Sequence, residues 1–244
     1  MGTSKKRPRT RTRGESAERE RKTGQSARRE RKASASAPRA GGAYHHGDLR
    51  RALLAATEEL LEAEGVEGFT LREVARRAGV SHGAPAHHFG DVRGLLSEFT
   101  AESFEQLSAT MRRRRARASD AAFDQLTASG IGYVEYALTH RARFQLMFRS
   151  GMLDLERASL VEAAGDAFGQ LVECIRRVAR EAGAPPELDY DKIALAWSIV
   201  HGFATLTIDN RNFAERVSAG SRTRALETVE RLIVSSRAAF ERRA

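Results

Sequence analysis

Histidine is the residue type in this sequence whose spacing comes nearest to a reactive or metal-binding pattern. His45-His46 and His87-His88 are adjacent pairs, while His82 and His201 stand alone. Adjacent residues on a helix point about 100° apart, so neither pair forms a chelate. No cysteine, and no clear carboxylate at i+4 of a pair, completes a ligand set. We therefore expect no metal site.

Covalent chemistry has little support either. The single cysteine, Cys174, lies in Leu171-Val-Glu-Cys-Ile175 on an apolar helix face, which predicts a packing residue. One cysteine also excludes a disulfide framework. The sequence has no phosphate-binding glycine loop, no nucleophile elbow and no H-E-x-x-H motif. We expect neither an enzyme nor a cofactor.

The charge of the chain is concentrated at one end. The 244 residues carry a net charge of +9. Residues 1–43 hold 14 Lys/Arg and 4 Asp/Glu, a balance of +10, whereas the other 201 residues hold 27 basic and 28 acidic side chains, a balance of −1. Residues 1–43 have no aromatic residue, so we expect disorder. This segment is either a solubilising tail or a basic arm that attracts phosphates.

The sequence shows neither a membrane-spanning segment nor a secretory signal. No apolar run reaches 18 residues, so a membrane-spanning helix is not expected. The first residues, MGTSKKRPRTRTR, have no apolar core of a secretory signal. The expected compartment is the cytoplasm.

From Tyr44 onward the hydrophobic period is helical. Asp48 is predicted to cap a helix with the apolar stripe Leu49, Ala52, Leu53, Ala56, Leu60, and Gly65 and Gly68 are predicted to end it.

A tight pair of helices is predicted next. Thr70-Leu-Arg-Glu73 forms a capping box, and Phe69 and Val74 have the spacing of a hydrophobic staple. Gly79 ends this helix, and Ser81 is predicted to cap another three residues later. Two short helices with a glycine-containing turn indicate a helix-turn-helix. The alternative is an ordinary helical hairpin in a bundle.

The rest of the chain predicts only helices, so the fold class is all-α. A long helix capped by Asp91 runs to the basic run Arg112–Arg115. Further helices are predicted over Ala121–Thr139, Arg141–Phe148, Asp154–Ala182, Asp189–Asn210 and Arg222–Arg242.

Residues 45–107 resemble the N-terminal domain of the TetR family of bacterial transcriptional regulators. The most specific segments are Thr70-Leu-Arg-Glu-Val-Ala75, Ala78-Gly-Val-Ser81, His88-Phe89-Gly90 and Leu95-Leu96. Ala196-Trp197-Ser-Ile-Val-His201-Gly202 is similar to a Trp…His-Gly signature of one sub-group. After the disordered basic arm expected over 1–43, the resemblance implies a DNA-binding domain over 44–91 and an effector-binding and dimerisation domain over 92–244.

The resemblance also implies a function. A homodimer would place two recognition helices, here Ser81–His88, in successive major grooves of a palindromic operator, and a small apolar effector would release the DNA. A repressor is the expected kind of regulator. The implied DNA-binding residues are His45, His46, Thr70, Leu71, Ser81, His82, Gly83, Ala84, Ala86, His87, His88 and Arg93.

The sequence departs from the family pattern at three places. Pro85 stands where the family usually has Leu or Ile, and Ala86 stands where it has a phosphate-contacting Tyr. Val92 replaces a common Lys, although Arg93 is adjacent. Pro85 falls in the first helical turn, where its missing amide costs little. We expect the basic arm to offset the lost phosphate contacts.

Aromatic and methionine residues gather in the second half of the chain. They either form the core of a helical bundle or line an effector cavity. The candidate cavity residues are Phe104, Tyr133, Tyr136, His140, Phe144, Met147, Phe148, Met152, Phe168, Trp197 and His201, and Gln145 is a further candidate polar group.

Two segments predict a dimer interface. Ile193–Ile208 has no charged residue, so it is expected to be buried on several sides. The last helix carries an apolar seam. The predicted interface residues are Leu206, Leu226, Val229, Ile233, Ser236 and Phe240.

Two other classes of protein stay open. The first is a non-specific nucleic-acid-binding protein that depends on the basic arm, with a degenerate helix-turn-helix. The second is a structural helical dimer with no role on DNA. A large ratio of specific to non-specific DNA affinity at physiological salt would distinguish an operator-binding protein from both.

Overall fold

The computed structural model describes residues 1–2, 46–66, 68–184 and 189–242. Residues 1–43 and His45 therefore fall almost wholly outside the described part. Every regular element in the described part is helical, which confirms the all-α prediction. The elements are α2 (His46–Glu64), α3 (Leu71–Arg77), α4 (Ala84–Phe89), α5 (Val92–Arg115), α6 (Ala122–Thr139), α7 (Arg141–Met147), η1 (Ser150–Met152), α8 (Ala158–Glu181), α9 (Tyr190–Asp209), α10 (Arg211–Ser218), α11 (Arg222–Ser235) and α12 (Arg237–Glu241).

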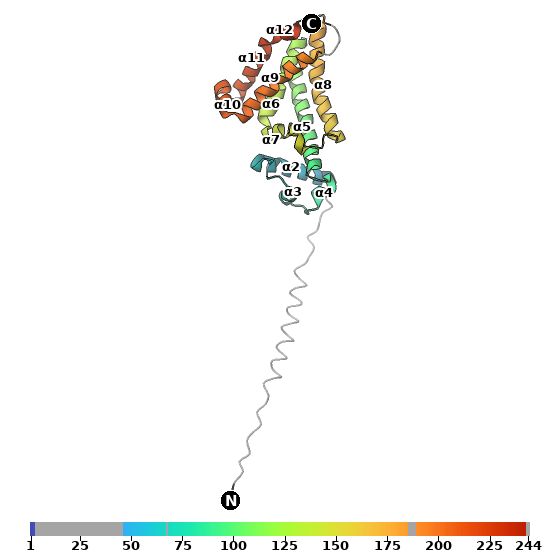
Figure 1. Ribbon diagram of the computed structural model, residues 1–244, viewed down its shortest axis with the longest axis vertical. Coiled ribbons are helices and arrows are strands. Elements are labelled where there is room, and N and C mark those ends of the chain that lie inside the picture. Colours follow the sequence, from blue (N-terminus) through green and yellow to red (C-terminus); the bar gives the residue numbers. More distant parts are fainter. Residues whose placement is uncertain (3–45, 67, 185–188, 243–244) are drawn as a thin grey trace. The chain divides into compact units, whose positions relative to one another are not determined.

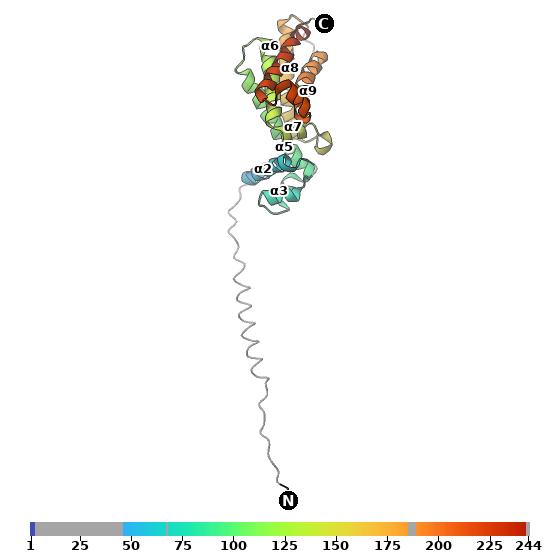
Figure 2. The same cartoon turned by 90° about the vertical axis from the view of Figure 1, so that its left-hand side faces the viewer.

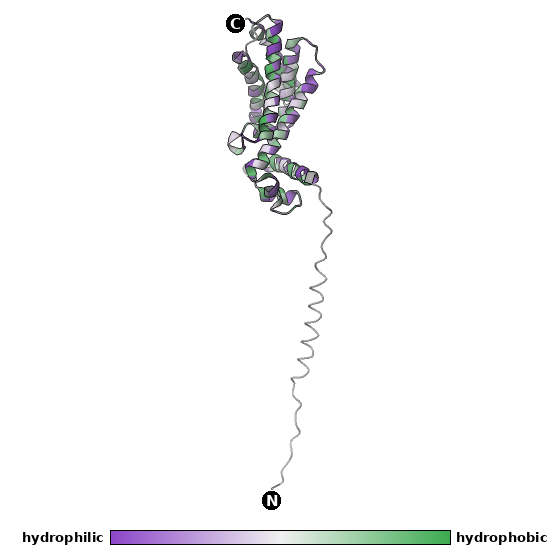
Figure 3. Cartoon of the chain, turned by 90° about the vertical axis from the view of Figure 1, so that its right-hand side faces the viewer, coloured by the Kyte–Doolittle hydropathy of each residue, from purple (hydrophilic) through white to green (hydrophobic). Residues whose placement is uncertain are grey.

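Within residues 46–242 the helices form two groups joined by α5. Figures 1 and 2 show α2, α3 and α4 at one end of α5, and α6, α8, α9 and α11 along its other half. Polar and apolar residues alternate along the helices in Figure 3, as expected when each helix buries one face.

The two hydrophobic cores both include α5. Leu95, Leu96 and Phe99 are buried in the core of α2–α4, together with Leu146 and Leu160 of the following bundle. Leu107 and Met111, further along the same helix, are buried in the second core. The first core thus extends past residue 91, where the sequence placed the boundary, and into the middle of α5.

Local capping chemistry explains where several helices begin and end. The Thr70 hydroxyl accepts from the Glu73 amide at 3.2 Å, and the Asp91 carboxylate accepts from the Gly94 amide at 2.8 Å. Gly79 has φ +67°, and the Val80 amide donates to the Ala75 carbonyl, which is a Schellman motif. Phe69 and Val74 are both buried in the first core, as the staple predicts.

The predicted cap of the first helix is wrong, whereas its predicted apolar stripe faces the first core. The helix α2 begins at His46, and Asp48 lies in its first turn, where it accepts from Arg51 instead of capping. Its buried residues include Leu54 and Leu61, while Leu49 and Ala52 are only half-buried.

The capping box at α3 is only half formed. Glu73 does not reach back to the cap, because both of its carboxylate oxygens accept from Arg76 and Arg77. These pairs hold the pKa of Glu73 near 2.

The C-terminal helices also differ from the prediction. The helix expected from Asp154 begins at Ala158 after the short turn η1. The helix α10 was not predicted, although Asn210 caps it by accepting from the Phe213 amide at 3.0 Å. The last helix breaks at Ser236, whose hydroxyl donates to the Leu232 carbonyl and whose amide bonds to Ile233.

The crossing of α5 and α6 depends on a glycine. A Cβ at Gly132 of α6 would lie 2.8 Å from the Cα of Met111 in α5. The neighbouring atoms are backbone, so neither helix can yield without moving as a whole.

We therefore expect Gly132→Ala to lower the free energy of unfolding by about 2 kcal/mol, because the overpacking outweighs the gain in helix propensity. The control is Gly165→Ala in α8, where a Cβ meets nothing within 4 Å, so the helix should become slightly more stable. Chemical denaturation measures both. Equal stabilisation of the two variants would contradict this packing account.

Candidate DNA-binding surface and effector cavity

The helix-turn-helix presents a small exposed surface. Ser81, His82, Gly83, Ala86 and His87 are exposed, while Ala84 and His88 are half-buried. Pro85 is buried and takes the inward position. Backbone and imidazole donors of this surface can reach phosphates or base edges.

The recognition helix begins later than the sequence predicted. It starts at Ala84 with Gly83 as its cap, and Ser81 does not cap it. A helix from Ser81 would need the amide of residue 85 to donate to the Ser81 carbonyl, and Pro85 has no amide hydrogen. The first helical bonds are instead a turn from Ala84 to Ser81 at 3.0 Å and then His87 to Gly83 at 3.0 Å.

The other predicted DNA-binding residues have mixed positions. Thr70 is exposed at the start of α3, and Leu71 is half-buried and packs against the first core. Arg93 is exposed, but its guanidinium donates to the Leu153 carbonyl, so it links α5 to the loop before α8. His46 is the first residue of α2, and His45 lies outside the described residues.

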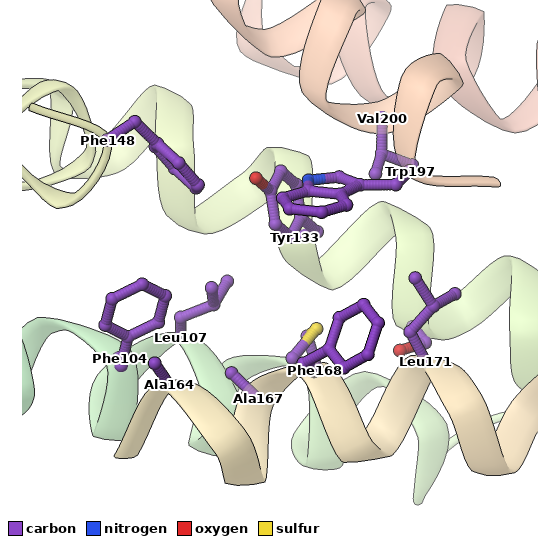
Figure 4. Close-up of a pocket in the computed structure, with 12 residues that line it drawn as sticks. Phe104, Leu107, Tyr133, Phe148, Ala164, Ala167, Phe168, Leu171, Trp197 and Val200 are labelled. Atoms are coloured by element: carbon purple, nitrogen blue, oxygen red, sulfur yellow. The ribbon is translucent and has the colours of Figure 1, made fainter. Parts of the chain in front are cut away.

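A cavity of about 260 Å³ lies inside the bundle. In Figure 4, Phe148, Tyr133 and Trp197 line one side, and residues of α5 and α8 line the other. The lining is apolar except for Ser129, the Tyr133 hydroxyl and the Trp197 indole nitrogen. The full set is Phe104, Leu107, Met111, Ser129, Tyr133, Phe148, Ala164, Ala167, Phe168, Leu171, Trp197 and Val200.

Five of the predicted cavity residues line this cavity: Phe104, Tyr133, Phe148, Phe168 and Trp197. Phe144 and His201 line a second, more open pocket instead. Tyr136 and Met147 are buried in the core, and burial raises the pKa of Tyr136 to about 12. His140 follows α6 and packs on Tyr136 with 4.9 Å between ring centroids, and Met152 packs against the first core.

Seven lining residues were not predicted from the sequence. They are Leu107, Met111, Ser129, Ala164, Ala167, Leu171 and Val200. A usable signal was present in α8, because Ala164, Ala167, Phe168 and Leu171 recur at i, i+3, i+4 and i+7. The small side chains of Ala164 and Ala167 leave space that larger side chains would fill.

The aromatic wall contains a direct polar contact. The Tyr133 hydroxyl and His201 Nδ1 are 2.9 Å apart. Burial raises the pKa of Tyr133 and lowers the pKa of His201. Both groups are therefore uncharged at neutral pH. Trp197 and His201 lie one turn apart on α9, and both side chains contribute to this wall.

Two protein-family models match the chain. The model described as "Bacterial regulatory proteins, tetR family" matches residues 53–99, and the model described as "Tetracyclin repressor-like, C-terminal domain" matches residues 126–232. The chain belongs to the TetR family of bacterial regulatory proteins.

Individual relatives agree with this assignment. The "HTH-type transcriptional regulator BetI" of Burkholderia mallei is 43% identical over 82 residues, which cover 33% of this chain and 42% of that protein. The chain thus matches less than half the length of these regulators.

Solved structures extend the similarity to both domains. A protein of unknown function from Rhodococcus sp. RHA1 is 31% identical, with a TM-score of 0.64, and the match covers 82% of this chain and 96% of that one. PfmR, a TetR family regulator from Thermus thermophilus, is 18% identical with a TM-score of 0.55, over 75% of this chain and 94% of that one, which shows the shared fold.

A buried ion pair joins the two groups of helices in this TetR protein. Arg143 of α7 donates from Nε and one terminal nitrogen to both oxygens of Glu58 in α2, each at 2.6 Å. The Arg143 guanidinium also lies 4.1 Å from the centre of the Phe99 ring and donates to Ser103 of α5. Only 8% of the Arg143 side chain is exposed. This one cation therefore contacts α2 and α5 from the edge of the bundle.

A second ionic cluster surrounds Glu98 of α5. Glu98 accepts from Arg50 of α2 at 3.0 Å, and from Arg157 and Ser159 at the start of α8 at 2.6 and 2.9 Å. Arg50 also pairs with Glu102 at 2.7 Å. Both clusters connect the DNA-binding helices to elements that lead into the cavity.

Three predicted interface residues face inward. Val229, Ile233 and Phe240 are at most 5% exposed and belong to the bundle core of this chain. Their prediction as contacts to a partner is wrong, because α11 packs on the chain's own α6 and α9, and the Phe240 ring of α12 lies 6.2 Å from the Phe123 ring of α6. Leu206 is exposed, whereas Leu226 and Ser236 are half-buried.

Cys174 is fully buried, and burial raises the pKa of its thiol, as expected of a packing residue. Within the described ranges, no three His, Cys, Asp or Glu side chains gather as a metal site would require. Nor does any helix in those ranges combine the length and hydropathy needed to cross a membrane.

The Arg143–Glu58 pair makes stability depend on pH. The bond from Arg143 lowers the pKa of Glu58 from 4.5. Its stabilisation is thus present above pH 4.5 and is lost as the pH falls through the lower value in the folded state. We expect Glu58→Gln to lower the free energy of unfolding by about 2 kcal/mol at neutral pH. The free energy of unfolding should then depend less on pH in the acid range.

The matched control is Glu241→Gln, which breaks the exposed Arg237–Glu241 pair and should cost less than about 1 kcal/mol. Denaturation at a series of pH values measures both. If the two variants lost equal stability, the pair would not have the anchoring role assigned to it.

Proposed function

We propose that this TetR-family protein is a sequence-specific DNA-binding transcriptional repressor that a small apolar effector releases from a palindromic operator. The observation that carries the proposal is α5, which packs in the helix-turn-helix core at one end and lines the cavity at the other. A ligand in the cavity and DNA on the helix-turn-helix would both act on this helix. The nucleoid is then its place of action.

On DNA, the residues in and just before α4 would have distinct roles. His82 and His87 would donate to base edges or phosphates, and Ala84 would contact a thymine methyl. Gly83 permits close approach of the backbone. Ser81, before the helix, can donate to a phosphate through its hydroxyl.

Release by an effector follows from the connections of α7. Phe148, which lines the cavity, directly follows α7, and Arg143 of the same helix holds Glu58 of α2. A ligand that displaces Phe148 would shift α7 and pull on α2. The spacing of two recognition helices in a dimer would then no longer match two half-sites about 34–36 Å apart.

The dimer that this requires is proposed on the outward face of α9. Leu195, Ile199, Gly202 and Leu206 recur at i, i+4, i+7 and i+11, an apolar stripe in which Leu195 and Ile199 are half-buried at the edge of the chain's own core. Leu206 is 47% exposed, and Leu232 of α11 is 45% exposed. A Cβ at Gly202 would meet nothing within 4 Å, which leaves room for a partner helix. An isologous pairing would bury this stripe.

We also propose that the chain belongs to the sub-group with the Trp…His-Gly signature. In that case the signature has a physical basis here: Trp197 and His201 hold the Tyr133 hydroxyl in the cavity wall, and Gly202 keeps the outward face open.

The function is tested by selecting fragments of genomic DNA at physiological salt with the full chain and with residues 44–244. We expect both to recover the same palindromic site, with the full chain losing affinity more steeply as salt rises. The double variant His82→Ala, His87→Ala should lose about tenfold or more in affinity for that site. Asn212→Ala, exposed on α10, is the control. Binding by the full chain alone, without sequence preference, would instead establish a non-specific binder that depends on residues 1–43.

The dimer is tested by Leu206→Arg, with Leu155→Arg as the control at a similarly exposed leucine outside the stripe. We expect the first change to weaken dimerisation about tenfold or more and the second to leave it unchanged. Analytical ultracentrifugation reports both. Wild-type dimerisation of the Leu206→Arg protein would place the interface elsewhere.

A further inference from the structure

A second cavity adjoins the apolar one. This vestibule, of about 300 Å³, is lined by Phe144, Gln145, Phe148, Arg149, His201, Thr205, Ile208 and Asp209. It shares Phe148 with the apolar cavity. One space is therefore almost wholly apolar, and the other carries amide, hydroxyl, imidazole and charged groups.

The partition between the two spaces is thin. The Phe148 ring lies 4.4 Å from the His201 ring on the vestibule side and 6.3 Å from the Phe104 ring on the cavity side, measured between centroids. Phe148 is 37% exposed and stands at the end of α7, beyond the last helical residue. A ring in this position can turn aside without unfolding a helix.

The polar groups of the partition connect the two spaces. The Tyr133 hydroxyl in the cavity wall and His201 Nδ1 are 2.9 Å apart. His201 also lines the vestibule, where its ring and the Thr205 hydroxyl are hydrogen-bonding groups.

The charges of the vestibule balance. Arg149 and Asp209 are its two charged residues, and Asp209 already accepts from Gln145 at 2.8 Å. A ligand carrying a full charge would therefore meet one charge of each sign, with no net charge of the opposite sign.

We propose that the effector is an amphipathic, uncharged molecule whose apolar body fills the cavity and whose hydrogen-bonding head, such as a hydroxyl or amide, lies in the vestibule past Phe148. This inference rests on the proposed function and specifies the ligand of its cavity. An engineered cavity of about 150 Å³ holds benzene, so a cavity of 260 Å³ holds a body of about ten carbon atoms.

Trp197 gives a direct readout, because it is the one tryptophan in the chain and lines the cavity. Titrations of the full-length protein would follow its fluorescence with 1-decanol, decanoate, decylammonium and cyclohexane. We expect 1-decanol to bind about tenfold or more tightly than either charged analogue. Cyclohexane, which has no head, should occupy the cavity alone.

Two matched variants locate the head group. Thr205→Val should lower the affinity for 1-decanol about fivefold and leave the affinity for cyclohexane unchanged, because it removes one hydrogen-bonding group from the vestibule. Thr223→Val, at an exposed threonine of α11 outside both cavities, should change neither.

The outcomes separate this inference from the proposed function. The inference would be overturned if decanoate or decylammonium bound most tightly, or if the two variants changed 1-decanol affinity equally. Cyclohexane binding would still show that the apolar cavity takes a ligand. If none of the four probes changed Trp197 fluorescence and none gave heat in calorimetry, both this inference and the proposed release of DNA by an effector would fail. Operator selection without ligand would still decide DNA binding by itself.

Discussion

The structure depends on one helix that belongs to two cores. The 24 residues of α5 begin at an Asp91 cap beside the helix-turn-helix and end in the bundle. Phe99 is fully buried in the first core, and Leu107 in the second lines the cavity eight residues later. A continuous helix transmits displacement along its axis with little bending, so the two ends cannot repack independently. The proposed ligand-dependent DNA binding rests on this shared helix.

Buried charge makes the connection specific. Arg143 would be costly to bury without a partner, and its partner Glu58 lies on α2 rather than within the bundle. Movement of α7 therefore either carries α2 with it or breaks the pair. Phe144 and Phe148 place the same short helix against the ligand spaces. In the proposed mechanism, the polar link and the aromatic wall make α7 the element through which occupancy of the cavity would reach the DNA-binding helices.

Local chemistry was predictable from the sequence, and tertiary packing was less so. Thr70, Gly79 and Asp91 act on the backbone within a few residues, so their caps follow from sequence alone. The predicted start of α4 was wrong because Pro85 removes a specific backbone bond that the Ser81 pattern does not reveal. The sequence pattern also did not reveal what the apolar stripe of α11 packs against. Such a stripe looks the same in sequence whether it packs inward, as Val229 does, or against a partner.

Filling the cavity should weaken DNA binding if α5 and α7 couple the two domains as described. The most direct measurement is the affinity of the full-length protein for its selected operator, with and without saturating 1-decanol, while Trp197 fluorescence reports that the cavity is occupied. We predict a loss of about tenfold or more in operator affinity, and by linkage an equal loss of ligand affinity on DNA. Unchanged operator affinity with the cavity filled would contradict this coupling.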